Sequence, residues 1–360
     1  LVPGVIGPFI GKTVLANAEM IVNNDGTESF VPNENIFLAA LVPIVLLAIL
    51  LFITSKTKKP TLNTSLKTPF EDDKTSDWSQ HPRPQMKREA YMSLCGEWQL
   101  SVAKKDVTEA LGSITVPYPP ESRISGIERQ LKKGEKYIYK KTFSLTDKMR
   151  GKRVLLHFGA VDQIAEITLN GACLGEHIGG YLPFEFDITN ALTDGENTLT
   201  VSVTDDLDHT LAWGKQRRDR GGMWYTPTSG IWQAVWLEAV PESYVKSIRI
   251  TPSLTGITVE IEGGEDEKRL ILKESGKEYR FCGNKAEIQV EEPKLWSPES
   301  PYLYEFTLEC GEDKIESYFA LRTVSIEQKN GKSYICLNGK PYFFHGLLDQ
   351  GYFSNGIYTP

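Results

Sequence analysis

The residues best suited to chemistry lie in the segment 215–230, KQRRDRGGMWYTPTSG, where charged, glycine and aromatic residues are mixed. Trp213, Trp224 and Tyr225 flank this segment or lie within it. Loops on a rigid scaffold are where proteins place binding groups. We therefore expect the segment to line a ligand site or an interface.

The other residues of catalytic type form no recognisable motif. No Ser/His/Asp or Cys/His nucleophile pattern is evident, and Gly179-Gly180 and Gly221-Gly222 are not followed by the Lys-Ser/Thr of a phosphate loop. The histidines lack metal-ligand spacing: His81, His157, His177, His209 and His345. The five cysteines are scattered without a Cys-x-x-Cys pair, which is typical of reduced, structural thiols. We expect no cofactor and assign no metal site.

Length and charge narrow the class of protein. A chain of 360 residues fits two or three domains, and a hydrophobic content of 40% is ordinary for a folded protein. The formal net charge of -7 argues against a nucleic-acid partner, because phosphate binding needs a basic face.

The elements that position these residues are predicted to be β-strands. Between 164 and 170, Glu166 and Thr168 alternate with Ile167 and Leu169, which indicates a half-buried strand, and Asn170-Gly171 predicts a hairpin turn. Short alternating runs recur from Tyr91 to about Val240 and predict a sandwich or jelly roll. The aromatic residues expected to anchor its core are Trp98, Trp232 and Trp236.

About seven further short strands fall between 241 and 331, which fits an immunoglobulin-like sandwich without its cysteine pair. After them, SYICLNGKPYFFHGLLDQG gives one more strand, an Asn338-Gly339 turn and an apolar run. The predicted fold class is therefore mainly β.

The run 36–53, IFLAALVPIVLLAILLFI, carries no charge and is long enough to span a bilayer. Lys56, Lys58 and Lys59 follow it, so the positive-inside rule predicts a membrane-anchored protein whose β domains are cytoplasmic. A buried core helix is the alternative. Residues 1–55 weakly resemble the tail of a major facilitator sugar transporter. In that case the chain joins two unrelated proteins, the β domains are simply cytoplasmic, and the soluble part starts near Met86.

The expected domain organisation has six parts. They are a tail outside or against the membrane at 1–35, a transmembrane helix at 36–54, a linker or arm at 55–87, a jelly-roll domain at 88–240, an immunoglobulin-like sandwich at 241–331 and the start of a further domain at 332–360.

Four stretches in this part of the chain resemble the N-terminal half of glycoside hydrolase family 2, the β-galactosidase and β-glucuronidase family. They are PRPQMKREAYMSLCGEWQL (82–100), HFGAVDQIAEITLNGACLGEHIGGYLPFEFDIT (157–189), GGMWYTPTSGIWQAVWLE (221–238), and LWSPESPYLYEFTLE with FALRTVSIEQKNGKSYICLNGKPYFFHG, ending at Gly346. The resemblance covers about 62–360.

This resemblance implies a sugar-binding jelly roll, an immunoglobulin-like sandwich and then a (β/α)₈ barrel, of which only the start lies within 332–360. Family members are retaining glycosidases that use two glutamates about 5 Å apart. Both are expected in later barrel strands, so no catalytic residue is assigned here and the fragment alone is expected to be inactive. A carbohydrate substrate and association into homo-oligomers are also implied.

The resemblance implies one pair of substrate contacts within the chain. Family members often carry an acidic or polar residue just after the first barrel strand, and Asp349 and Gln350 occupy that position in HGLLDQG. An Asp beside Gly is also an ordinary turn former. A different class of function, a carbohydrate-binding or membrane-tethered interaction module without catalysis, stays open at this stage.

Overall fold

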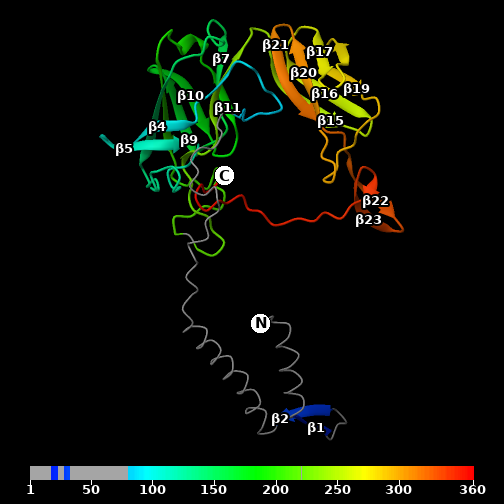
Figure 1. Cartoon of the computed structure of the whole chain (residues 1–360). Helices are drawn as coiled ribbons and strands as arrows, with labels where there is room; N and C mark the ends of the chain where they lie inside the picture. The colour runs from blue at the N-terminus through cyan, green and yellow to red at the C-terminus, as the bar shows by residue number, and fades with distance from the viewer. Residues whose placement is uncertain (1–17, 23–27, 33–79, 220) are drawn as a thin grey trace. The chain divides into compact units, whose positions relative to one another are not determined.

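The computed structural model describes residues 18–22, 28–32, 80–219 and 221–360, and the chain divides into two units, 1–71 and 72–360. In the first unit, β1 (Ala18–Val22) pairs antiparallel with β2 (Glu28–Pro32). The rest of the described chain belongs to the second unit and is built from strands, with one short 3₁₀ helix, Thr189–Ala191 (Figure 1). The prediction of a mainly β fold is confirmed.

The first sandwich of the second unit has a six-stranded sheet, ordered β10-β9-β12-β6-β4-β5, and a four-stranded sheet, ordered β11-β7-β14-β3, with the small pair β13-β8 beside them. Its strands are β3 (Tyr91–Ser93), β4 (Gly96–Lys104), β5 (Val107–Val116), β6 (Lys136–Phe143), β7 (Arg153–Phe158), β8 (Val161–Asp162), β9 (Ile164–Leu169), β10 (Ala172–Ile178), β11 (Phe184–Asp187), β12 (Asn197–Thr204), β13 (Gly230–Ile231) and β14 (Val235–Val240).

The alternation at 164–169 places its apolar face in the core. Ala165, Ile167 and Leu169 are fully buried, while Glu166 on the opposite face is exposed. The predicted hairpin is also confirmed, since Asn170 and Gly171 both adopt positive φ and join β9 to β10 with Leu169 opposite Ala172.

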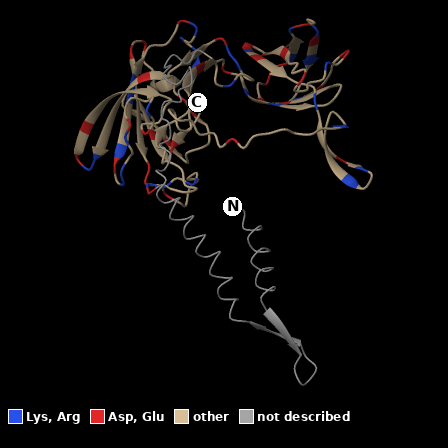
Figure 2. Cartoon of the chain, turned by 60° about the horizontal axis from the view of Figure 1, so that its bottom comes forward, with Lys and Arg blue, Asp and Glu red and all other residues tan. Residues whose placement is uncertain are grey.

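The second sandwich has a three-stranded sheet, β15-β16-β19, and a four-stranded sheet, β18-β17-β20-β21. Its strands are β15 (Val245–Pro252), β16 (Gly256–Gly263), β17 (Lys268–Leu272), β18 (Glu278–Phe281), β19 (Lys285–Gln289), β20 (Tyr304–Cys310) and β21 (Asp313–Phe319). It has its own core, which includes Val259, Leu270 and Phe306. Acidic and basic residues are interspersed along the strands and loops of both sandwiches (Figure 2).

The last sheet contains β22 (Val324–Lys329), β23 (Lys332–Leu337) and β24 (Lys340–Pro341), and the Asn338-Gly339 turn connects β23 to β24 as predicted. Apolar side chains here stay largely exposed, including Ile326 at 76% and Phe343 at 79%. From this sheet the chain runs back to the first sandwich (Figure 1).

The predicted membrane-anchored localisation is not supported and is corrected here. Within the described ranges, no helix is long and apolar enough to cross a bilayer. The run 36–54, on which the transmembrane helix was predicted, lies outside the described residues.

Candidate functional site

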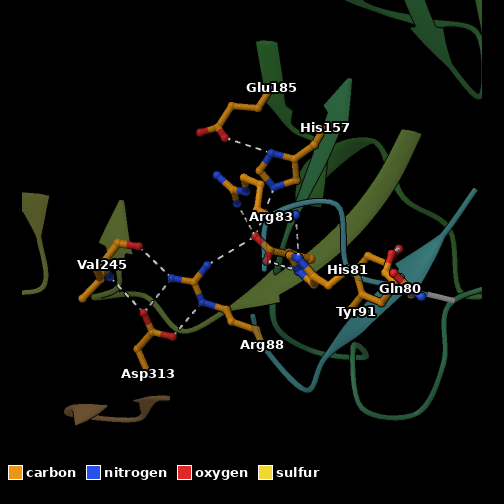
Figure 3. Close-up of polar contacts among 10 residues, drawn as sticks. Gln80, His81, Arg83, Arg88, Tyr91, His157, Glu185, Val245 and Asp313 are labelled. Carbon is orange, nitrogen blue, oxygen red and sulfur yellow. Dashed lines mark hydrogen bonds and ion pairs between the residues drawn. The ribbon is translucent and has the colours of Figure 1, made fainter. Parts of the chain in front are cut away.

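A highly charged buried cluster among the described residues surrounds Glu238 of β14, whose side chain has no exposed surface. Figure 3 labels its partners His81, Arg83, Arg88 and His157. Glu238 Oε1 accepts a hydrogen bond from His81 Nε2 at 2.9 Å, and its Oε2 accepts from Arg83 Nη2 at 2.7 Å and Arg88 Nη1 at 3.3 Å. His157 Nε2 lies 3.3 Å from the same Oε2. Burial alone would raise the pKa of Glu238, but the histidine and arginine partners outweigh burial and lower it.

Arg88 connects this cluster to the second sandwich. Its Nε and Nη2 donate to the two carboxylate oxygens of Asp313 at 2.8 and 2.9 Å, and Nη2 also donates to Val245 O at 2.7 Å (Figure 3). Beside it, the backbones of Lys87 and Glu316 exchange two hydrogen bonds of 3.0 and 2.8 Å. The segment 81–88 therefore joins both sandwiches.

We interpret the Glu238 cluster as a structural clamp. The side chains of His81, Arg88 and Glu238 are 2%, 4% and 0% exposed, so a substrate cannot reach them. A buried charge that is paired and hydrogen-bonded holds its partners in one geometry.

The loop 205–229, which contains the segment predicted to bind, connects β12 to β13 and is anchored by one fully buried side chain, Gln216. Gln216 Oε1 accepts from Thr228 N at 2.7 Å, which ties the middle of the loop to its C-terminal end. Its Nε2 donates to Tyr181 Oη at 3.1 Å and to Asp162 Oδ2 at 3.3 Å. A single amide thus fixes the loop to the sandwich.

The C-terminal segment lies against this loop. Tyr352 Oη accepts from Thr226 N at 3.1 Å, and the Tyr352 ring stacks on Tyr225 with centroids 5.4 Å apart. Tyr358 Oη donates to Gly214 O at 3.4 Å. Parts of the chain separated by more than a hundred residues therefore form one surface, as the red C-terminal trace beside the green loops of the first sandwich shows (Figure 1).

Aromatic side chains of the loop stack into a column. The rings of His209 and Trp213 are stacked with centroids 4.1 Å apart, those of Trp213 and Trp224 are 5.8 Å apart, and the Arg217 guanidinium lies 5.0 Å from the Trp224 ring. Each tryptophan ring therefore has two ring or guanidinium neighbours within the loop. The column stiffens the loop and leaves ring edges and its outer ends for contact with a ligand.

Three carboxyl groups surround the base of the loop. Asp162 and Asp205 are 3% and 4% exposed, while Glu121 is half-buried and accepts from Ser229 N at 3.2 Å. Burial, with smaller contributions from the neighbouring carboxylates, raises the pKa of Asp162 and of Glu121 to about 8. Burial likewise raises the pKa of Asp205 to about 6.

Two surface depressions bear on ligand binding. A polar cleft of about 200 Å³ lies at the loop and is lined by Glu121, Glu128, Gln130, Arg218 and Thr226. It is smaller than the ~300–1,000 Å³ of a typical ligand pocket, so further surface is needed to enclose a ligand. A groove of about 630 Å³ on the second sandwich includes charged residues already paired with one another, such as Lys277 with Glu291, and we assign it no ligand.

Asp349 and Gln350, the predicted substrate contacts, are both exposed. Asp349 Oδ1 accepts a hydrogen bond from Gly351 N at 2.8 Å, which is the turn-forming contact of an Asp near Gly. The structure brings Tyr352, three residues later, against the loop 205–229.

Among the other residues weighed from the sequence, Trp98 and Trp236 are core residues as predicted, whereas Trp232 is half-buried. Trp232 Nε1 donates to Gly180 O at 2.8 Å, and its ring contacts Tyr181 and Tyr358, so it belongs to the support of the loop. All five cysteines are free, and the described residues contain no cluster of three His, Cys, Asp or Glu that could hold a metal ion.

Sequence reasoning missed Gln216, Asp162 and Tyr181 as the supports of the loop. Gln216 lay inside the segment that was singled out, and Tyr181 follows the Gly179-Gly180 pair. The available signal was Gly180, because two adjacent glycines before an aromatic residue are typical of a close approach of the backbone to another group. That group is the Asp162 carboxylate, whose Oδ1 would lie 2.3 Å from a Cβ at position 180.

Comparison with known proteins gives two family matches. Residues 106–233 match the model of the glycosyl hydrolase 2 galactose-binding domain-like family, and residues 242–322 match that of glycosyl hydrolases family 2. A β-galactosidase of Thermoanaerobacter pseudethanolicus is 32% identical over 237 residues, which are 58% of this chain and 31% of that protein. A β-glucuronidase of Felis catus is 27% identical over 65% of this chain and 42% of its own length. The chain therefore spans less than half the length of these curated relatives.

Solved structures have the same fold. A β-glucuronidase from an uncultured Clostridium species superposes with a TM-score of 0.62 at 24% identity, over 77% of this chain and 52% of that one. A Bifidobacterium dentium β-glucuronidase complexed with coumarin-3-O-glucuronide superposes with a TM-score of 0.62 at 22% identity, over 77% of this chain and 55% of that one. With two family models that together match more than half of its length, the chain belongs to glycoside hydrolase family 2.

Proposed function

We propose that this chain supplies the N-terminal domains of a retaining glycoside hydrolase acting on terminal β-linked sugars, of the β-galactosidase or β-glucuronidase type. The relatives that support this reaction class carry those names. Their two catalytic glutamates correspond to no residue identified here, and we expect them in barrel strands that follow Pro360.

The domain assignment is part of the proposal. The first sandwich is a sugar-binding jelly roll at 88–240, the second an immunoglobulin-like sandwich at 241–331, and 332–360 is the start of a (β/α)₈ barrel. Two separate hydrophobic cores support the first division. The exposed apolar side chains from β22 to Phe353 support the assignment of 332–360 to the start of a barrel, because the rest of a barrel would cover them.

The observation that carries the functional proposal is the contact between the loop 205–229 and the C-terminal segment. Thr226 and Tyr225 meet Tyr352, so the binding loop of the first sandwich lies beside the segment that carries Asp349 and Gln350. In barrel enzymes the substrate site lies at the carboxyl ends of the strands. A segment that follows a first barrel strand and touches a polar, aromatic loop is a suitable place to contact a sugar, and we propose Asp349 and Gln350 as such contacts.

The test is to express the longest protein that contains this sequence and assay it against chromogenic β-galactosides, β-glucuronides and β-mannosides. We expect hydrolysis of one of these substrates with retention of configuration. A folded full-length protein that cleaves none of them would refute the proposal and favour the carbohydrate-binding module, which sugar titration by calorimetry would then examine. Light scattering of the same preparation tests the expected homo-oligomer.

A further inference from the structure

The support of the loop 205–229 contains buried carboxyl groups without a cationic partner. Among the described residues, no lysine, arginine or histidine side chain forms an ion pair with Asp162, Asp205 or Glu121. The nearest cationic contact is Arg218, which donates to the backbone oxygen of Asp205 at 3.3 Å. An ionised carboxylate in such a place loses its hydration without gaining a counter-charge.

Asp162 is the most enclosed of the three. It pairs with Gly230 across the β8–β13 ladder, and Gly180 packs directly on its carboxylate. Within the described part of the chain, the one side-chain donor to its carboxylate is Gln216 Nε2, at 3.3 Å. Since Gln216 also binds Thr228 N, the geometry links Asp162 to the middle and to the C-terminal end of the loop.

We propose that Asp162 is a positioning residue that lies beneath the loop 205–229 as a neutral carboxylic acid, because it is buried without a cationic partner, and that its ionisation favours opening of the loop, since the carboxylate regains its hydration only in the open state. The hydrogen bond that Gln216 Nε2 donates to Asp162 Oδ2 by itself favours the ionised form, so the direction of the effect follows from burial and the missing counter-charge. This inference rests on the proposed function in one respect only, that the loop contacts substrate. The link between the proton and loop order rests on the burial of Asp162 without a counter-charge and on its position against Gln216 of the loop.

The titratable and charged groups near Asp162 come from four other parts of the described chain. They are Glu121 and Glu128 between β5 and β6, Tyr181 between β10 and β11, Asp205 and Arg218 within the loop, and Tyr358 near the C-terminus. The charges of Asp205 and Glu121 favour protonation of Asp162, whereas the positive charge of Arg218 favours ionised carboxylates. Burial is the largest cause of the raised pKa of Asp162, followed by the charge of Asp205.

The sign of the pH effect follows from linkage. The pKa of Asp162 is about 8 in the folded loop and close to its ordinary value of 3.8 when the loop opens and the carboxyl is hydrated. The closed loop therefore binds more protons than the open one between these values. The closed loop is most stable relative to the open loop below about pH 4, and it becomes less stable as the pH rises to about 8.

Hydrogen exchange of the full-length protein tests this directly, with labelling times corrected for the intrinsic pH dependence. The reporters are the amides of Arg217, Tyr225 and Thr228, whose acceptors are Tyr225 O, Lys215 O and Gln216 Oε1. We expect wild-type protection to fall between pH 5 and pH 8. The Asp162→Asn side chain has a similar shape and cannot ionise. In this variant the protection of the reporter amides should fall less steeply with pH than in the wild type, by up to about tenfold per pH unit, which is the contribution of one proton.

Asp194→Asn is the matched control, because Asp194 is exposed and its side chain contacts neither the loop nor its support. It should reproduce the wild-type slope. If amide protection falls with pH equally steeply in the wild type and in Asp162→Asn, the proposal is overturned. Wild-type protection that does not change with pH would also overturn it, and that measurement needs no variant.

If the enzyme is active, the pH dependence of KM should flatten in the Asp162→Asn variant in the same way, while kcat at low pH stays within a few-fold of wild type. Absence of glycosidase activity would count against the proposed function alone, because the exchange slopes are measured without substrate.

Discussion

The clamp around Glu238 and the support around Asp162 are buried to a similar depth and solve the same electrostatic problem in opposite ways. Glu238 is surrounded by arginines and histidines, and its pKa is lowered. Asp162 faces an amide and other carboxyl groups, and burial raises its pKa to about 8. Protein cations compensate the charge of the first carboxyl, whereas the environment of the second favours its neutral, protonated form. The charge of Glu238 is therefore retained at neutral pH, whereas Asp162 is the group that we propose to make the loop sensitive to pH.

Removal of the charge of Glu238 should have the largest effect on stability. Glu238→Gln removes the buried negative charge that Arg83, Arg88 and two histidines share, although Arg88 keeps its pair with Asp313, and this should lower the free energy of unfolding by about 3–5 kcal/mol. Urea unfolding at pH 7 measures this change. The matched control is Glu166→Gln, which breaks an exposed 2.8 Å pair with Lys136 and should cost at most about 0.5 kcal/mol. Equal losses of unfolding free energy in the two variants would show that the charge of Glu238 does not stabilise the junction of the sandwiches.

A methyl group at position 180 should disturb the loop support by steric means. A Cβ at Gly180 would lie 2.3 Å from Asp162 Oδ1 and 2.4 Å from its Cγ. Gly180→Ala should therefore destabilise the protein by about 1–3 kcal/mol, the range for overpacking a closed site. Gly195→Ala is the control, because nothing lies within 4 Å of its added Cβ and it should have little effect. Thermal unfolding compares the stability of the two variants. A Gly180→Ala protein as stable as the wild type would show that the space between Gly180 and Asp162 is not closed.

Acid pH should weaken the clamp. The pKa of Glu238 is lowered in the folded protein from its ordinary value of 4.5, so its contribution to stability is present above pH 4.5 and is lost as the pH falls below it. The difference in unfolding free energy between wild type and Glu238→Gln should shrink by about 1.4 kcal/mol for each pH unit below 4.5. Urea titrations at pH 7 and pH 3 provide the comparison. A constant difference would mean that the Glu238 charge does not stabilise the junction.

The proposed substrate contact should have a smaller effect, confined to catalysis. Asp349→Ala removes an exposed carboxylate that otherwise caps a turn, so stability should change little. Loss of a hydrogen bond to a sugar hydroxyl should raise KM about 2- to 10-fold. Steady-state kinetics of the full-length enzyme measure this change, with Asp194→Asn as the control. Unchanged kinetics would exclude Asp349 from the site.

The sequence predicted local features better than the long-range ones. The strand at 164–169 and the turn at Asn170-Gly171 follow from alternation and from backbone conformations that two neighbouring residues specify themselves. The partnership of Gln216 with Asp162 spans 54 positions and depends on how β8, β13 and the loop are brought together, which periodicity does not encode. Trp232 was misplaced for the same reason, since a strand-like pattern does not reveal that the chain leaves the sheet between β13 and β14.

The most direct test of the account is hydrogen exchange of the full-length protein with and without a saturating concentration of the sugar that it cleaves. If the loop 205–229 and the segment 349–353 form part of the substrate site, both should gain protection on binding, while the clamp residues 81–88 stay unchanged. Protection that appears elsewhere in the protein and leaves both segments unaltered would contradict the proposed site.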